Sequence, residues 1–225
     1  MIGFVVAMEK EAKIFLAQTN LKSSTEIAGK TIYFGSLLNK DFVLIISGIG
    51  KVNASISTQI LVDKFDIDYI INFGVAGGKA SSNLEAGDIV LISSVCQYDF
   101  DLSEIDNVNI GYMQDYDLTF YPTAHKQYTG NFFKIRKGAS GDRFTQNTYW
   151  LDIIAKLGGE VVDMECGAIA QTALANKTPL FIIKLISDVD GDDKSIFEQY
   201  VNNVREICDK FPNAIRELID NIDFK

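Results

Sequence analysis

The chain has 225 residues, of which 47% are hydrophobic and 23% charged, so it contains enough apolar material for the core of one globular domain, which we expect to span 1–225. Its formal net charge of −9 disfavours nucleic acid, whose phosphates attract clustered Lys and Arg, and also an anionic membrane surface. A small neutral ligand in a pocket is compatible with this charge.

Histidine and cysteine usage limits the possible chemistry. The single histidine, His125, excludes a multi-histidine metal site. A Ser-His-Asp hydrolase would have to use His125, and the chain has no G-x-S-x-G motif. The three cysteines, Cys96, Cys166 and Cys208, are far apart, as expected for free thiols in a reducing compartment.

The N-terminus resembles a buried strand more than a targeting signal. Its apolar run, 2–8, lacks a preceding basic region and is followed at once by Glu9. No run approaches the roughly 20 apolar residues that a membrane span requires. We therefore expect a cytoplasmic protein.

Apolar runs and helical patterns alternate along the chain. Five runs have strand length without regular alternation, which is typical of strands covered on both faces: 2–7, 42–47, 69–73, 88–95 and 180–187. Helical patterns lie at about 8–18, 51–64, 146–157, 164–176 and 195–221. This order predicts an α/β fold with a sheet between layers of helices.

The segment 96–137 interrupts the alternation. It is rich in Asp and Tyr, and residues near 103–128 show no periodicity. A loop of this length in a compact domain is usually functional or part of an interface, although a decorated surface loop is the simpler alternative.

Three acidic residues lie close to predicted strand ends. Glu11 follows the first run, Asp188 follows the last, and Glu165 ends the stretch V-V-D-M-E at 161–165. Ligands of open α/β sheets bind beyond the carboxyl ends of the strands, so these carboxylates could meet in one pocket. A solvated helix start would explain Glu11 as well, and a turn after the strand would explain Asp188. Glu165 is the hardest to explain without a ligand, because buried carboxylates are costly unless paired.

The glycine-rich strand ends do not match a nucleotide-binding motif. G-I-G-K-V-N at 48–53 has Asn53 at the third glycine position of a dinucleotide-binding turn. A P-loop would require glycine at Ile45 and Ser or Thr at Val52. An NAD-binding domain is therefore disfavoured.

Six motifs together resemble the 5′-methylthioadenosine/S-adenosylhomocysteine nucleosidases. They are A-M-E-K-E (7–11), S-G-I-G-K-V (47–52), I-N-F-G-V-A-G-G (71–78), S-G-D-R-F (140–144), V-D-M-E (162–165) and I-S-D-V (186–189). The resemblance spans nearly the whole chain and implies a three-layer α/β/α fold with a central mixed sheet, like that of the nucleoside phosphorylases. It also implies hydrolysis of an adenine N-glycosidic bond, with no metal and no cofactor.

The resemblance implies a role for each matching residue. Glu11 would activate water, and Asp188, held by Ser187, would protonate N7 of adenine. Ribose would bind Glu165 beside Met164. The base would lie against Phe144 and the backbone of Thr145. Met8, Gly77 and Phe197 would complete the substrate site, Phe197 beside the 5′ group. Apart from the resemblance, we assign Asp163 to structure, as a helix N-cap.

Some residues depart from the family pattern, in which Tyr-His-Asp often stands at Gln97-Tyr98-Asp99, Ser at Val75, Glu at Asp163 and Arg at Lys184. These departures bear on substrate preference more than on reaction type. A 6-amino-6-deoxyfutalosine hydrolase activity and a narrowed preference for one thioether are both possible. Related phosphorylases carry Arg before the glycine-rich strand end, whereas 71–74 holds no cation here. We therefore expect a nucleosidase.

A phosphorylase and a non-catalytic purine-binding protein are the alternatives to this reaction. A homodimer is expected as well, because family members pair through a loop and the segment 98–121 could be that loop.

Overall fold

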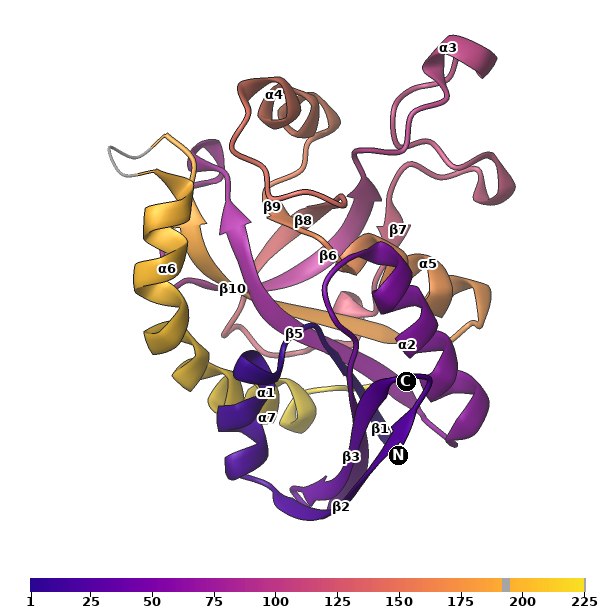
Figure 1. Cartoon of the computed structure of the whole chain (residues 1–225), viewed down its shortest axis with the longest axis vertical. Coiled ribbons are helices and arrows are strands. Elements are labelled where there is room, and N and C mark those ends of the chain that lie inside the picture. Colours follow the sequence, from indigo (N-terminus) through magenta and orange to yellow (C-terminus); the bar gives the residue numbers. More distant parts are fainter. Residues whose placement is uncertain (192–194, 225) are drawn as a thin grey trace.

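The computed structural model describes residues 1–191 and 195–224, the side chains of 204–206 excepted, and has the expected mixed α/β architecture (Figure 1). Its strands are β1 Ile2–Val6, β2 Asn20–Ile27, β3 Lys30–Leu37, β4 Lys40–Ile46, β5 Tyr69–Gly78, β6 Ile89–Gln97, β7 Tyr121–Pro122, β8 Lys134–Ser140, β9 Val161–Asp163 and β10 Leu180–Val189. Its α-helices are α1 Glu9–Ala17, α2 Lys51–Lys64, α3 Ser103–Asp106, α4 Thr148–Leu157, α5 Cys166–Ala175, α6 Ile196–Ile207 and α7 Phe211–Asp220.

The strands form one mixed sheet in the order β10-β6-β8-β9-β5-β1-β4-β3-β2. β5 lies between β1 and β10 and runs parallel to both. Because β10 pairs with β5 as well as with β6, the strands β5, β10, β6, β8 and β9 close into a ring. The sequence predicted the central sheet but not this closure, which depends on pairings between distant strands.

Helices cover the two faces of the sheet. On β1, Phe4 and Val6 face a core that includes residues of α1 and α7, while Val5 faces a core that includes residues of α2 and α5. Figure 1 shows α1 and α7 on one side of the sheet and α2 and α5 on the other. All five residues of β1 are buried, as predicted for a strand covered on both faces.

The predicted helix over 195–221 was wrong in its length. It is two helices, α6 and α7, separated by a short 3₁₀ helix at Cys208–Lys210. Pro212 lies in the first turn of α7, where its missing N–H is tolerated, whereas it would break the interior of a continuous helix. No helix in the described ranges is long and apolar enough to cross a membrane.

Two strands are longer than predicted, and others were missed. β5 continues through the glycines to Gly78 and β10 continues to Val189, so Asp188, which was expected just after the strand, lies within the sheet as Ser187 does. β2, β3 and β8 were not predicted from the sequence. Seven of the eight residues of β2 are exposed, so this edge strand lacks the apolar run that marks a buried strand.

Candidate active site

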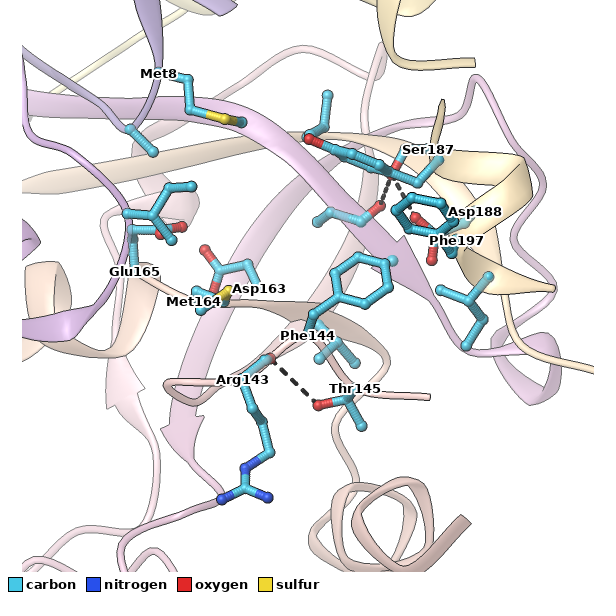
Figure 2. Close-up of a pocket in the computed structure, with 18 of the residues that line it drawn as sticks. Met8, Arg143, Phe144, Thr145, Asp163, Met164, Glu165, Ser187, Asp188 and Phe197 are labelled. Carbon is cyan, nitrogen blue, oxygen red and sulfur yellow. Dashed lines mark hydrogen bonds between the residues drawn. The ribbon is translucent and has the colours of Figure 1, made fainter. Parts of the chain in front are cut away.

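One cavity of about 400 Å³ lies where β1, β4, β5, β8, β9 and β10 end, and the first turns of α1 and α6 border it (Figure 2). Its volume is in the range that small-molecule sites occupy. All ten residues that the sequence analysis nominated line it: Met8, Glu11, Gly77, Phe144, Thr145, Met164, Glu165, Ser187, Asp188 and Phe197. The structure therefore brings together side chains that lie up to 189 positions apart in the chain.

The cavity has further lining residues that the sequence analysis did not nominate. They include Ile49, Val75, Arg143, Asp163, Ile196 and Tyr200. Tyr200 follows Phe197 by three positions on α6, so helical spacing could have placed both on the same face. Ile49 lies inside the motif 47–52, which was noted for its glycines. Nothing in the sequence indicated that the Ile49 side chain itself would line the cavity.

Glu11 is held by the start of its own helix and by β5. Its carboxylate accepts the N–H of Met8, the N-cap residue of α1, at 3.0 Å and the N–H of Val75 at 2.9 Å. Burial raises the pKa of Glu11, although both N–H donors and Lys184 favour the ionised form. A Cβ at Gly74 would lie 2.9 Å from Glu11 Oε1, so a side chain there would shift the carboxylate from its present position. Glu11 is thus a fixed, relatively basic carboxylate with unused lone pairs.

Asp188 lies at the other end of the cavity. The Ser187 hydroxyl donates to Asp188 Oδ1 at 2.6 Å. Burial raises the pKa of Asp188, the Ser187 hydrogen bond lowers it, and the charge of Asp190 raises it further. A Cβ at Gly77 would come within 2.8 Å of Asp188 Oδ2, so this glycine makes room for the carboxyl group. A buried carboxyl group with a raised pKa is suited to donate a proton.

Glu165 is the N-cap residue of α5 and points into the cavity. Its Oε1 accepts the N–H of Gly50 at 2.9 Å, and Gly50 can present this N–H because its φ of 97° is accessible to glycine. Burial, with repulsion from Asp163, raises the pKa of Glu165 to about 7. The glycine loop at 48–50 therefore donates to a carboxylate of the protein itself.

An ion pair is buried beneath these acids. Lys184 Nζ lies 2.9 Å from Asp163 Oδ2, with side-chain exposures of 2% and 4%. Asp163 also accepts the hydroxyl of Ser140 at 2.7 Å and the N–H of Cys166, the first residue of α5, at 3.0 Å. Burial alone would raise the pKa of Asp163, but Lys184, the Cys166 thiol and the Ser140 hydroxyl hold it below its ordinary value. Asp163 thus supports the start of α5, although the N-cap position itself belongs to Glu165.

Aromatic rings surround the outer part of the cavity. The Phe144 ring lies 6.4 Å from that of Phe197 and 5.9 Å from that of Tyr200, and Figure 2 shows Phe144 and Phe197 near Asp188. Phe144 is 49% exposed and Phe197 57%, so a ligand could cover both. Thr145 is anchored by the hydroxyl of Tyr98, 2.7 Å from its Oγ1.

The arrangement can bind a planar group and carry out acid–base chemistry on it. Its rings offer a stacking surface, and three carboxyl groups with raised pKa values face the same space. Within 1–191 and 195–224, no group of three or more His, Cys, Asp or Glu side chains has the geometry to hold a metal ion.

Comparison with known proteins identifies relatives over most of the chain. The family model of the phosphorylase superfamily matches residues 1–220. A 5′-methylthioadenosine/S-adenosylhomocysteine nucleosidase of Colwellia psychrerythraea is 36% identical over 219 residues, covering 88% of each chain.

Solved structures resemble the fold over its whole length. The adenine complex of a Colwellia psychrerythraea 5′-methylthioadenosine/S-adenosylhomocysteine nucleosidase superposes with a TM-score of 0.83 at 30% identity, covering 98% of this chain and 95% of that chain. A futalosine hydrolase of Helicobacter pylori reaches a TM-score of 0.85 at 21% identity, covering 98% and 97%. The second likeness concerns the fold alone.

Removing the partner of Lys184 should destabilise the protein. We expect Asp163→Asn to lower the free energy of unfolding by roughly 3–5 kcal/mol, because a buried ammonium loses its counter-charge. Urea denaturation measures this change, and Asp68→Asn, which affects an exposed pair with the N-terminus, is the control with an expected cost below about 1 kcal/mol. Adding Lys184→Met to Asp163→Asn should restore part of the loss. If Asp163→Asn and Asp68→Asn lowered the free energy of unfolding by the same amount, the buried pair would not have the importance assigned to it.

Proposed function

The chain belongs to the 5′-methylthioadenosine/S-adenosylhomocysteine nucleosidase family within the phosphorylase superfamily, and from this premise we propose its reaction and the residues that perform it. The protein hydrolyses the adenine N-glycosidic bond of 5′-methylthioadenosine and S-adenosylhomocysteine, releasing adenine and the thioribose sugar. The observation that carries this proposal is the meeting of Glu11, Glu165 and Asp188 in one cavity of nucleoside size.

Asp188 acts on the leaving base. Adenine is a poor leaving group as an anion, so its N7 must gain a proton or a strong hydrogen bond as the bond breaks. The raised pKa of Asp188 keeps a larger fraction of the acid protonated, and Ser187 fixes its orientation. Phe144 stacks on the base, and the backbone of Thr145 contacts its edge.

Glu165 binds the ribose. A carboxylate can accept two donors at once, as the adjacent 2′- and 3′-hydroxyls require. Met164 packs against the sugar, and Met8 and Phe197 lie by the 5′ group. As the bond breaks, the sugar carbon becomes cation-like, and the negative charge of Glu165 stabilises it.

Glu11 orients and deprotonates the attacking water. Its two backbone donors hold the carboxylate in place and leave lone pairs to accept from water. Burial makes Glu11 more basic than an ordinary glutamate, which suits the role.

Three cations that lie close to the acids or to the loops around them are already engaged, which favours water over phosphate as the nucleophile. A phosphorylase must hold a phosphate dianion, usually with arginines. Here Lys184 pairs with Asp163, Lys51 pairs with Asp99 at 2.6 Å, and the Arg143 guanidinium lies 4.0 Å from the centre of the Trp150 ring. This engagement of the cations supports hydrolysis.

One assay tests the reaction type. The enzyme is supplied with 5′-methylthioadenosine, with and without phosphate, and the sugar product is identified. We expect methylthioribose and adenine in equal amounts, at a rate that phosphate does not change. Phosphate-dependent formation of a sugar 1-phosphate would identify a phosphorylase, and adenine binding without turnover would identify a binding protein.

A homodimer is the proposed assembly. Val52 and Ile56 on α2 are 70% and 44% exposed, and they border a groove that also includes Tyr116 from the segment 98–121. An exposed apolar surface of this kind suits contact with a second copy of the chain. Light scattering should give twice the chain mass of 25.0 kDa, and a mass of one chain would contradict the proposal.

The proposed acid can be tested by an isosteric change. Asp188→Asn should lower kcat on 5′-methylthioadenosine by about 10²–10⁴-fold, because an amide cannot supply the proton. Adenine binding, measured by calorimetry, should persist and show that the site is still folded. Near-normal kcat in this variant would remove Asp188 from its role.

The pH profile should reveal Glu165. Because its pKa is about 7, Glu165 becomes protonated as the pH falls through that value and loses affinity for the ribose hydroxyls, so kcat/KM should decline below about pH 7. In Glu165→Gln, kcat/KM should be roughly 10–100-fold lower, and the decline near pH 7 should disappear. Persistence of that decline in the variant would assign it to another group.

A further inference from the structure

The rim of the cavity carries a cation that the proposed reaction does not use. Lys10 lies between Met8 and Glu11, which both line the cavity. Its ammonium crosses from α1 to α6 and donates to the hydroxyl of Tyr200 at 2.8 Å, 5.0 Å from the centre of that ring. Tyr200 itself lines the cavity. Lys10 therefore places a positive charge beside the opening.

This end of the cavity faces solvent and is aromatic. Phe197 is exposed, whereas Asp188 and Glu165 are buried deeper. Tyr200 follows Phe197 by one turn of α6. A 5′ substituent that passes Phe197 on its way out would therefore reach Tyr200 and Lys10 next.

The hydrogen bond between Lys10 and Tyr200 prepares two donors. Because the Tyr200 oxygen accepts from Lys10, its own O–H remains available to donate, and the ammonium keeps two further N–H groups. Two donors that meet at one place match the two oxygens of a carboxylate. A neutral chain end gains nothing there, and an ammonium is repelled.

The other cations near the cavity are less suited to this role. Lys184 is buried in its pair with Asp163. Arg143 stacks on Trp150, and Figure 2 shows its guanidinium directed away from the acids and from Phe197. Of the described residues, Lys10 is thus the cation best placed to meet the end of a 5′ substituent.

We propose that Lys10, with Tyr200, selects nucleosides whose 5′ substituent is an apolar thioether chain ending in a carboxylate. This inference rests on the proposed function, because it takes the base to lie at Asp188 and the ribose at Glu165. It ranks the substrates of that site: a tail that ends in a carboxylate without a neighbouring ammonium is preferred over an uncharged tail of the same length.

A matched pair of substrates tests the proposal. 5′-(3-Carboxypropylthio)-5′-deoxyadenosine and 5′-butylthio-5′-deoxyadenosine differ only in their terminal carboxylate or methyl group. The readout is the ratio of their kcat/KM values, in which any effect of Lys10 on Glu11 cancels. The variants are Lys10→Met and Tyr200→Phe, and Lys13→Met, on the same helix and exposed, is the matched control.

The wild-type ratio should favour the carboxylate about three- to fivefold at low salt, since partly exposed ion pairs are modest, and should approach one at about 1 M salt. Lys10→Met should bring the ratio to one or below, Tyr200→Phe should lower it partly, and Lys13→Met should leave it unchanged. A wild-type ratio of one or below, an unchanged ratio in Lys10→Met, or an equal fall in Lys13→Met would overturn the proposal. If neither nucleoside is cleaved, the proposed function fails, and the ratio of their Kd values from calorimetry tests Lys10 in the same way.

Discussion

The buried ion pair between Lys184 and Asp163 makes the rest of the site possible. Without a counter-charge, the repulsion that Asp163 and Glu11 exert on the buried Glu165 would be uncompensated. Lys184 lies within β10 and supplies that charge from beneath the cavity, with 2% of its side chain exposed. Asp163 in turn ties β8 and β9 to the start of α5. This one ion pair thus connects strands of the closed part of the sheet and also supplies the positive charge of the site.

The positive charge of Lys184 compensates Asp163 but does not fully compensate the other buried acids of the cavity. The acids that remain uncompensated are the groups to which a substrate can bind. Asp163 is fully satisfied and keeps a pKa below its ordinary value, whereas Glu165 and Asp188 have raised pKa values in the same cavity. In the proposed reaction, these groups, which are costly in the free protein, would gain ribose hydroxyls and a purine nitrogen as partners. A buried acid among apolar residues therefore points to a ligand more strongly than an exposed acid does.

The sequence predicted the parts of the molecule that follow from local patterns. The buried strands β1 and β5 appeared as apolar runs, and Glu11, Glu165 and Asp188 could be nominated because each lies beside one. Lys184 could not be assigned its place, because its partner Asp163 lies on another strand and no local pattern encodes that pairing. The edge strand β2 was missed because it is exposed, and the separation of α6 from α7 was missed although Pro212 marks it.

The central claim is that three acids from distant parts of the chain act on one nucleoside. A crystal structure with an analogue of 5′-methylthioadenosine whose glycosidic linkage cannot break tests it most directly. In that complex we expect Asp188 within about 2.6–3.2 Å of the atom that replaces N7, Glu165 at the same distance from both ribose hydroxyls, and a water between Glu11 and the anomeric carbon. An analogue bound in another cavity, or with its base turned away from Asp188, would contradict it.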